Sequence, residues 1–179
     1  MDTSITTPRG TVIIRLAREE DVQAYRGLRL EALRNHPEAF SSDYAANLAK
    51  PLTYWADRLK PDVTNSTVAL YFAAHDRQLI GMCGIARADS PKTQHSASII
   101  SMYVQPDWRG FRIAGGLIAA CLDWARARDV KIVKLAVVTT NSAAIHCYGR
   151  WGFRAYGVEP QALYYDGVYY DELLMAQTT

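Results

Sequence analysis

A glycine-rich stretch at residues 104–116 has the residue types that bind an anion. It reads Val-Gln-Pro-Asp-Trp-Arg-Gly-Phe-Arg-Ile-Ala-Gly-Gly and follows an apolar run. Small residues at the start of a helix let another group approach the backbone, and the free N–H groups of the first turn hold a phosphate well. Arg109 adds a positive charge at the same place. This stretch therefore predicts a site for a phosphate-bearing ligand.

The same glycines also have a purely structural interpretation. Gly110 can serve a turn alone, while Gly115 and Gly116 can let a helix pack closely on a sheet. Common nucleotide-binding loops do not fit, because the stretch lacks the G-x-G-x-x-G spacing and has no G-K-[ST] ending. The stretch alone does not decide between ligand binding and packing.

A second segment, residues 141–153, contains a tyrosine placed on an expected short helix. Its sequence is Asn-Ser-Ala-Ala-Ile-His-Cys-Tyr-Gly-Arg-Trp-Gly-Phe. An aromatic residue at such a position more often packs in the core than takes part in chemistry. A phenol is nevertheless a suitable proton donor. His146 lies two positions before Tyr148, so the two face different sides of a helix, and we expect His146 to be exposed.

Together the two segments resemble the GNAT superfamily of N-acetyltransferases. The family's first motif is Arg/Gln-x-x-Gly-x-Gly/Ala, whose ends match Arg109 and Ala114. Its second pattern, Asn-x-x-Ala-x-x-x-Tyr-x-x-x-Gly-Phe, is met in full from Asn141 to Phe153. Arg112 stands where the family usually has its central glycine, and a left-handed backbone there would strain an arginine.

The resemblance implies acetyl-CoA as the acyl donor and a set of residues that hold it. The pantetheine arm would follow main-chain groups at the end of a strand, and the pyrophosphate would rest on the amides of the glycine-rich turn. Asn141 would contact the pantetheine or cap its own helix. The implied cofactor-binding residues are Met102, Tyr103, Val104, Arg109, Gly110, Phe111, Arg112, Ile113, Ala114, Gly115, Asn141, Ala144 and Tyr148.

The resemblance also implies direct transfer of the acetyl group to a primary amine in a ternary complex. Tyr148 is the implied catalytic residue, as the proton donor to the leaving thiolate. The base is open between Glu31, Glu159 and an ordered water chain. Glu31, Phe40 and Glu159 are the expected acceptor-binding residues. No metal is expected.

The pattern of apolar residues predicts a mixed α/β fold. The resemblance makes it a GNAT-like fold: a mostly antiparallel sheet of six to seven strands with a splayed parallel pair and about four helices. In the first expected helix, Val22, Tyr25, Leu28 and Ala32 form an inward stripe that leaves Arg26, Arg29 and Arg34 outside. Strands are expected at 11–17, 67–74, 79–87, 97–104, 131–138, 155–158 and 168–175, and helices up to 35 and at 113–128 and 142–150, with one or two short helices within 40–59.

Composition limits the classes of partner. The 179 residues carry a formal net charge of +2, too balanced for binding nucleic acid or a membrane by bulk electrostatics. The three cysteines are scattered and are expected to be small buried hydrophobes. Residues 1–10 show no secretory signal, which favours a cytoplasmic protein with a flexible tail at 1–10 and a single domain at 11–176. Homodimerisation through the tyrosine-rich final strands is a further expectation.

Two other functional classes stay open. A non-catalytic acyl-CoA-binding or regulatory domain would keep the cofactor site and lose the transfer reaction. A plain interaction module would use the glycines for packing only. Acyl-CoA binding and thiol release distinguish these classes from an enzyme.

Overall fold

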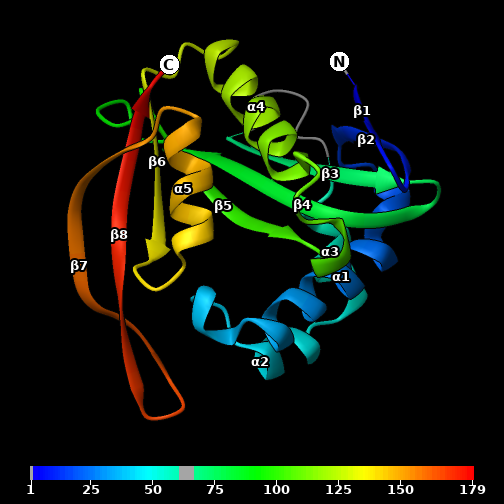
Figure 1. The fold of residues 1–179 in the computed structure, drawn as a ribbon, viewed down its shortest axis with the longest axis horizontal. Helices are drawn as coiled ribbons and strands as arrows, with labels where there is room; N and C mark the ends of the chain where they lie inside the picture. The colour runs from blue at the N-terminus through cyan, green and yellow to red at the C-terminus, as the bar shows by residue number, and fades with distance from the viewer. Residues whose placement is uncertain (1, 61–66) are drawn as a thin grey trace.

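The computed structural model describes residues 2–60 and 67–179, and its centre is one eight-stranded sheet (Figure 1). The strands lie in the order β1-β2-β3-β4-β5-β6-β8-β7, and all neighbours are antiparallel except β5 and β6. The predicted mixed fold with one parallel pair is confirmed. The strands are β1 (Thr3–Thr7), β2 (Gly10–Leu16), β3 (Val68–His75), β4 (Gln78–Arg87), β5 (Ser96–Val104), β6 (Ile132–Val138), β7 (Arg154–Tyr165) and β8 (Val168–Thr178).

Helices cover both faces of this sheet. Residues of β3 alternate between two apolar clusters: Ala69 and Ala73 pack with α4, whereas Leu70 and Phe72 pack with α1 and α3. This period of two is what a strand buried on both faces requires. None of the described helices has the length and apolar character needed to cross a membrane. The helices are α1 (Val22–Asn35), α2 (Tyr44–Leu48), α3 (Leu52–Asp57), α4 (Ile113–Arg126) and α5 (Ser142–Arg150), with 3-10 turns at Glu19–Asp21, Pro37–Ala39 and Pro106–Trp108.

The expected flexible tail at residues 1–10 is wrong for the part that forms β1. Thr3–Thr7 pair antiparallel with β2, and this pairing accounts for the strand beyond the expected six to seven. Ile5 lies against Gly116 of α4, where an added Cβ would come within 2.8 Å of the Ile5 Cδ1 atom. Main-chain pairing with β2 and the contact of Ile5 with α4 hold Thr3–Thr7 in place. Because few apolar side chains are needed, the sequence of this strand has no apolar run that would predict it. Met1 lies outside the described residues, and the single domain at 11–176 stays a prediction.

Strands β5 and β6 pair over only a short length. Their parallel register runs from Ser96 opposite Ile132 to Ser98 opposite Lys134, and the strands then diverge. On the other edge of β5, the register with β4 shifts between Met82 and Gly84, and Ser101 adopts a φ of 56°. Such a bulge bends a strand. The bend takes the end of β5 away from β6 and confirms the splayed pair.

The turn before α4 has a left-handed backbone at two positions. Gly110 has a φ of 83° and Arg112 a φ of 63°, and α4 begins at the next residue, Ile113. An arginine in this region costs roughly 1–2 kcal/mol, because its Cβ crowds the following carbonyl. The Arg112 side chain is exposed and makes no capping hydrogen bond. The backbone is therefore strained at the position where a glycine was expected from the family pattern.

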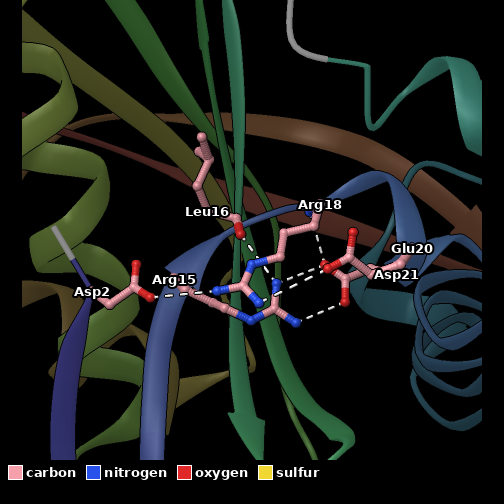
Figure 2. Close-up of polar contacts among 6 residues, drawn as sticks. All are labelled: Asp2, Arg15, Leu16, Arg18, Glu20 and Asp21. Carbon is pink, nitrogen blue, oxygen red and sulfur yellow. Dashed lines mark hydrogen bonds and ion pairs between the residues drawn. The ribbon is translucent and has the colours of Figure 1, made fainter.

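A buried ion pair fixes the start of α1 to the end of β2 (Figure 2). Two nitrogens of Arg15 each donate to a carboxylate oxygen of Asp21 at 2.7 Å, and the main-chain N–H of Arg18 donates at 2.8 Å. Burial disfavours the carboxylate, but these hydrogen bonds and charges outweigh it and lower the pKa of Asp21. The exposed Arg18 side chain is 3.6 Å from Asp2 of the N-terminal segment.

Replacing Asp21 should destabilise the protein and change how its stability depends on pH. Asp21→Asn leaves Arg15 buried without its counter-ion, so we expect a loss of about 3 kcal/mol of unfolding free energy at pH 7. Because the folded pKa is lowered, the contribution of Asp21 is present above its unfolded pKa of about 3.9 and is lost as pH falls below that value. Urea unfolding at pH 7 and pH 3 measures both effects.

The control for this prediction is Glu20→Gln on the same turn. Glu20 is exposed and only 3.9 Å from an exposed arginine nitrogen, so its loss should change stability by less than about 0.5 kcal/mol. Equal effects of the two variants would contradict a structural role for the Arg15–Asp21 pair.

Candidate active site

The divergence of β5 and β6 opens a pocket between them. This inner pocket has a volume of about 440 Å³ and is lined by Ile99–Met102 of β5 and Leu135–Val138 of β6. Past Ser98 and Lys134 the two strands no longer pair, so the facing edge of β5 is free for another extended group. The structure thus provides the strand edge that the resemblance required for a pantetheine arm.

A longer groove runs from the inner pocket across the start of α4. This long groove has a volume of about 1420 Å³, and its walls include the strand end Met102–Val104 and the turn from Arg109 to Gly115. Residues 4–8, which include most of β1, contribute to another wall. Met102, Phe40, Val138, Asn141 and Ala144 line both cavities, which therefore adjoin.

The turn presents free main-chain donors to the long groove. The first helical hydrogen bond in α4 runs from the Gly116 N–H to the Arg112 carbonyl at 3.1 Å, so the amides of Ile113–Gly115 lack partners within the helix. A Cβ added at Gly110 would meet nothing within 4 Å. At Gly115 an added Cβ would come within 2.9 Å of the Trp151 ring nitrogen, so this glycine serves close packing. Space for a ligand is therefore found at Gly110, whereas close packing accounts for Gly115.

Arg109 stabilises the end of β5 and also places a positive charge at the turn before α4. Its Nε donates to the Val104 carbonyl at 3.0 Å, and an Nη lies 2.9 Å from the Nε2 atom of His36. The guanidinium is exposed and lies 6.0 Å from the centre of the Tyr103 ring. Positive charge is thus held at the junction of β5 with the groove.

Tyr148 lies on α5 and lines the inner pocket. Its side chain is 6% exposed and packs edge-on against Phe153, with the ring centres 5.8 Å apart. Burial, and to a smaller extent the neighbouring Cys83, raises the pKa of Tyr148, so the phenol holds its proton at neutral pH. His146 on the same helix is exposed, as expected.

Asn141 caps its own helix, and its contact with pantetheine stays a prediction. Its side-chain oxygen accepts from the Ala144 N–H at 3.1 Å and caps α5, which confirms the capping role. The residue also lines both cavities. The cap thus fixes the helix that carries Tyr148 relative to the end of β6.

Two of the three expected acceptor-binding residues lie away from the pocket. Phe40 lines both cavities, but Glu31 and Glu159 line neither. The Glu31 carboxylate accepts from the Tyr103 hydroxyl at 2.9 Å and from the Gln105 side chain at 2.8 Å. Glu159 is exposed on β7. Glu31 therefore supports the end of β5, and a role of Glu31 or Glu159 as the base stays a prediction.

Sequence reasoning missed two charged residues that do line the inner pocket, Arg29 and Glu172. Arg29 was expected outside the apolar stripe of the first helix, but it is 8% exposed. The signal for its burial was present, because Arg29 lies four residues after Tyr25 and three before Ala32. Glu172 on β8 is opposite Val138 of β6 and Glu159 of β7. No local pattern shows that β8 lies between those strands.

The described residues provide no group of three or more His, Cys, Asp and Glu side chains that could hold a metal ion. Cys83 and Cys121 are buried in the core, with their sulfurs 3.5 Å apart, while Cys147 is half-buried and lines the long groove. The site is thus composed of main-chain amides, a phenol, an arginine and a carboxylate.

Known proteins are similar to this chain in sequence or in fold. A mycothiol acetyltransferase of Brachybacterium faecium is 30% identical over 144 residues, which cover 79% of this chain and 40% of that protein. The chain thus spans about two fifths of the length of that relative. A GNAT-family acetyltransferase of Streptococcus pneumoniae has the same fold, with a TM-score of 0.83 and 19% identity, over 94% of this chain and 99% of that chain.

The fold also matches a structure that contains the expected donor. The yncA protein of Salmonella typhimurium, solved with its cofactor acetyl-CoA, gives a TM-score of 0.75 at 18% identity over 93% of each chain. The model of the acetyltransferase (GNAT) family matches residues 25–153, which include both motif segments. This chain belongs to the acetyltransferase (GNAT) family.

Proposed function

We propose that the chain transfers an acetyl group from acetyl-CoA to a primary amine. The observation that carries this proposal is the junction of the long groove, whose turn offers phosphate-binding amides, with an inner pocket that contains a buried phenol. The curated relatives are acetyltransferases, which supports the reaction class. An amine that reaches the inner pocket meets the donor's reactive end at the shared wall.

The residues of the long groove fit acetyl-CoA. Main-chain groups of Met102–Val104 would bind the pantetheine arm, and the amides from Gly110 to Gly115 would bind the pyrophosphate. Arg109 would add charge there, and the exposed Arg112 is free to do so. When bound, acetyl-CoA supplies a thioester carbonyl for the amine to attack and a thiolate leaving group.

Two side chains of the inner pocket would handle the protons of the transfer. A protonated amine loses two protons as its amide forms. The base accepts one of them. Tyr148 donates its own proton to the thiolate sulfur, and the second proton from the amine restores the phenol. Burial raises the pKa of Glu172, with a smaller effect from Glu159, so its carboxylate has a greater affinity for a proton. Glu172 lines the pocket. Of the three carboxylates Glu31, Glu159 and Glu172, we therefore propose Glu172 as the base.

Removing the phenol should slow turnover without abolishing it. Tyr148→Phe keeps the packing on Phe153 and removes the proton donor, so we expect kcat to fall on the order of a hundredfold, with coenzyme A affinity unchanged. Release of free thiol in the presence of an amine panel measures kcat, and calorimetry measures affinity. Tyr156→Phe, at an exposed tyrosine of β7, is the matched control and should have no effect.

The outcomes of that experiment distinguish the functional classes. Acetyl-CoA binding without thiol release from wild type, and no effect of Tyr148→Phe, would favour a non-catalytic acyl-CoA-binding or regulatory domain. Failure of wild type to bind acetyl-CoA by calorimetry would reject the proposal altogether.

A carboxylate placed at the glycine-rich turn should weaken coenzyme A binding. Gly110→Asp puts a negative charge beside the proposed pyrophosphate site, and we expect Kd for coenzyme A to rise at least about tenfold, or about 1.4 kcal/mol. Gly167→Asp is a matched control, because Gly110 and Gly167 have φ values of 83° and 80° and both have open space around an added Cβ. A plain interaction module would show the same coenzyme A affinity in both variants.

The final two strands also support a homodimer as part of this proposal. β7 is an edge strand, and apolar side chains on the β7–β8 hairpin are exposed, including Tyr164 at 64% and Tyr169 at 60%. A second copy could cover this face and pair with the strand edge. Light scattering should give twice the chain mass, and Tyr164→Lys combined with Tyr169→Lys should give the monomer mass. A monomeric wild type would contradict the dimer.

A further inference from the structure

The inner pocket contains a buried cation that has no counter-ion among the described residues. Arg29 on α1 is 8% exposed and lines the pocket, and its Nη1 atom is buried without a hydrogen-bond partner among the described residues. None of the described acidic side chains forms an ion pair with it. A buried arginine stays charged, so its burial has a cost that no acidic side chain of the described residues offsets.

The neighbours of Arg29 hold its guanidinium in place and do not neutralise it. The group lies 4.7 Å from the centre of the Phe40 ring, which also lines the pocket. Burial lowers the pKa of Arg29. Among the smaller effects, Tyr25 opposes this shift, Arg58 adds to it and Tyr54 opposes it. Arg58, which donates to the Tyr25 hydroxyl at 3.2 Å, adds a second positive charge to this wall.

Another wall of the same pocket has the opposite charge. Glu172 of β8 reaches the pocket beside Val138 at the end of β6, whereas Arg29, Arg58 and Phe40 come from the helical side. A carboxylate suits an ammonium group, and a guanidinium suits a carboxylate or phosphate. The pocket wall thus carries groups of both charges, on different elements.

We infer that the acceptor amine also bears an anionic group, a carboxylate or a phosphate, which binds the Nη1 side of Arg29 while the amine faces Glu172. This inference rests on the proposed acetyl transfer and narrows its substrate class. An acceptor with both charges would neutralise both walls. A polyamine, which brings only positive charge, would leave Arg29 unpaired and would be repelled by it.

Matched pairs of amines test the inference. L-phenylalanine and L-phenylalanine amide differ only in the carboxylate, and phosphoethanolamine and ethanolamine differ only in the phosphate. We expect kcat/KM from thiol release to favour the anionic member of at least one pair by tenfold or more. The pair that shows the preference identifies the anion as a carboxylate or a phosphate.

Variants at Arg29 assign the preference to that side chain. Arg29→Met should abolish it, chiefly by raising KM for the anionic acceptor, and should raise the melting temperature of the ligand-free protein, because an uncompensated buried charge is removed. Arg29→Lys keeps a charge and should retain part of the preference. Arg34→Met is the control, because Arg34 is exposed on the same helix and lines neither cavity.

A binding measurement separates this inference from the proposed function. N-acetyl-L-phenylalanine should raise the melting temperature of wild type more than its amide does, and N-acetyl-phosphoethanolamine more than N-acetylethanolamine if the anion is a phosphate; the difference should vanish in Arg29→Met. Thiol release with neutral amines and no preference for anionic ones would overturn the inference and leave acetyl transfer standing. No thiol release with any amine would count against the proposed function, while the melting-temperature differences would still support or overturn the anion site.

Discussion

The short parallel pairing of β5 and β6 is the constraint on which the rest of the site depends. Two strands that paired over their full length would close the sheet, and helices would then cover a continuous surface. Here the pairing stops after Ser98 and Lys134, and the bulge at Ser101 carries β5 away. The free strand edge, the inner pocket and the access of Tyr148 to it all follow from this single separation.

The surrounding structure stabilises an opening that would otherwise be unfavourable. Arg109 donates to the Val104 carbonyl, and Glu31 accepts from Tyr103 and Gln105, so the end of β5 is held by side chains in place of a neighbouring strand. Burial, with the added effect of the Glu31 hydrogen bond, raises the pKa of Tyr103 to about 12, so this phenol stays a donor to Glu31. Strain at Ser101 and Arg112 is a further cost of the open arrangement.

The sequence predicts the elements of this fold better than their contacts. The β5–α4–β6 order and the bounds of α5 follow from local apolar patterns and turn residues, and both motif segments lie at the groove as expected. β1 was missed because main-chain pairing with β2 leaves little trace in side-chain type. The near-continuous run of Ile, Val and Leu at 131–138 indicates a strand buried on both sides, but Ala136 of β6 is exposed where the strand borders the opening.

Sequence reasoning missed Glu172 and Arg29 at the inner pocket, because contacts between distant parts of the chain bring them there. Glu31 and Glu159 were considered as bases because their types fit. Glu172 lies directly opposite Glu159 in the β7–β8 pair and lines the pocket, whereas Glu159 is exposed and does not line it. Arg29 was assigned to the surface from its type, although its phase on α1 matches that of Tyr25 and Ala32. The charge of Arg29 favours an exposed position and its place along the helix favours a buried one, and the side chain is buried.

Burial acts in one direction on Tyr148, Glu172 and Arg29 of the inner pocket, toward the neutral form. Tyr148 and Glu172 can respond by holding a proton, which suits a donor and gives a carboxylate a stronger affinity for one. Arg29 cannot respond, because a guanidinium keeps its proton even when buried. None of the described acidic side chains pairs with its charge, and the anionic group proposed for the acceptor would balance it. Such a balancing group would also displace water around Glu172 and Tyr148, so recognition of the acceptor and preparation of the proton-transfer groups would be one event.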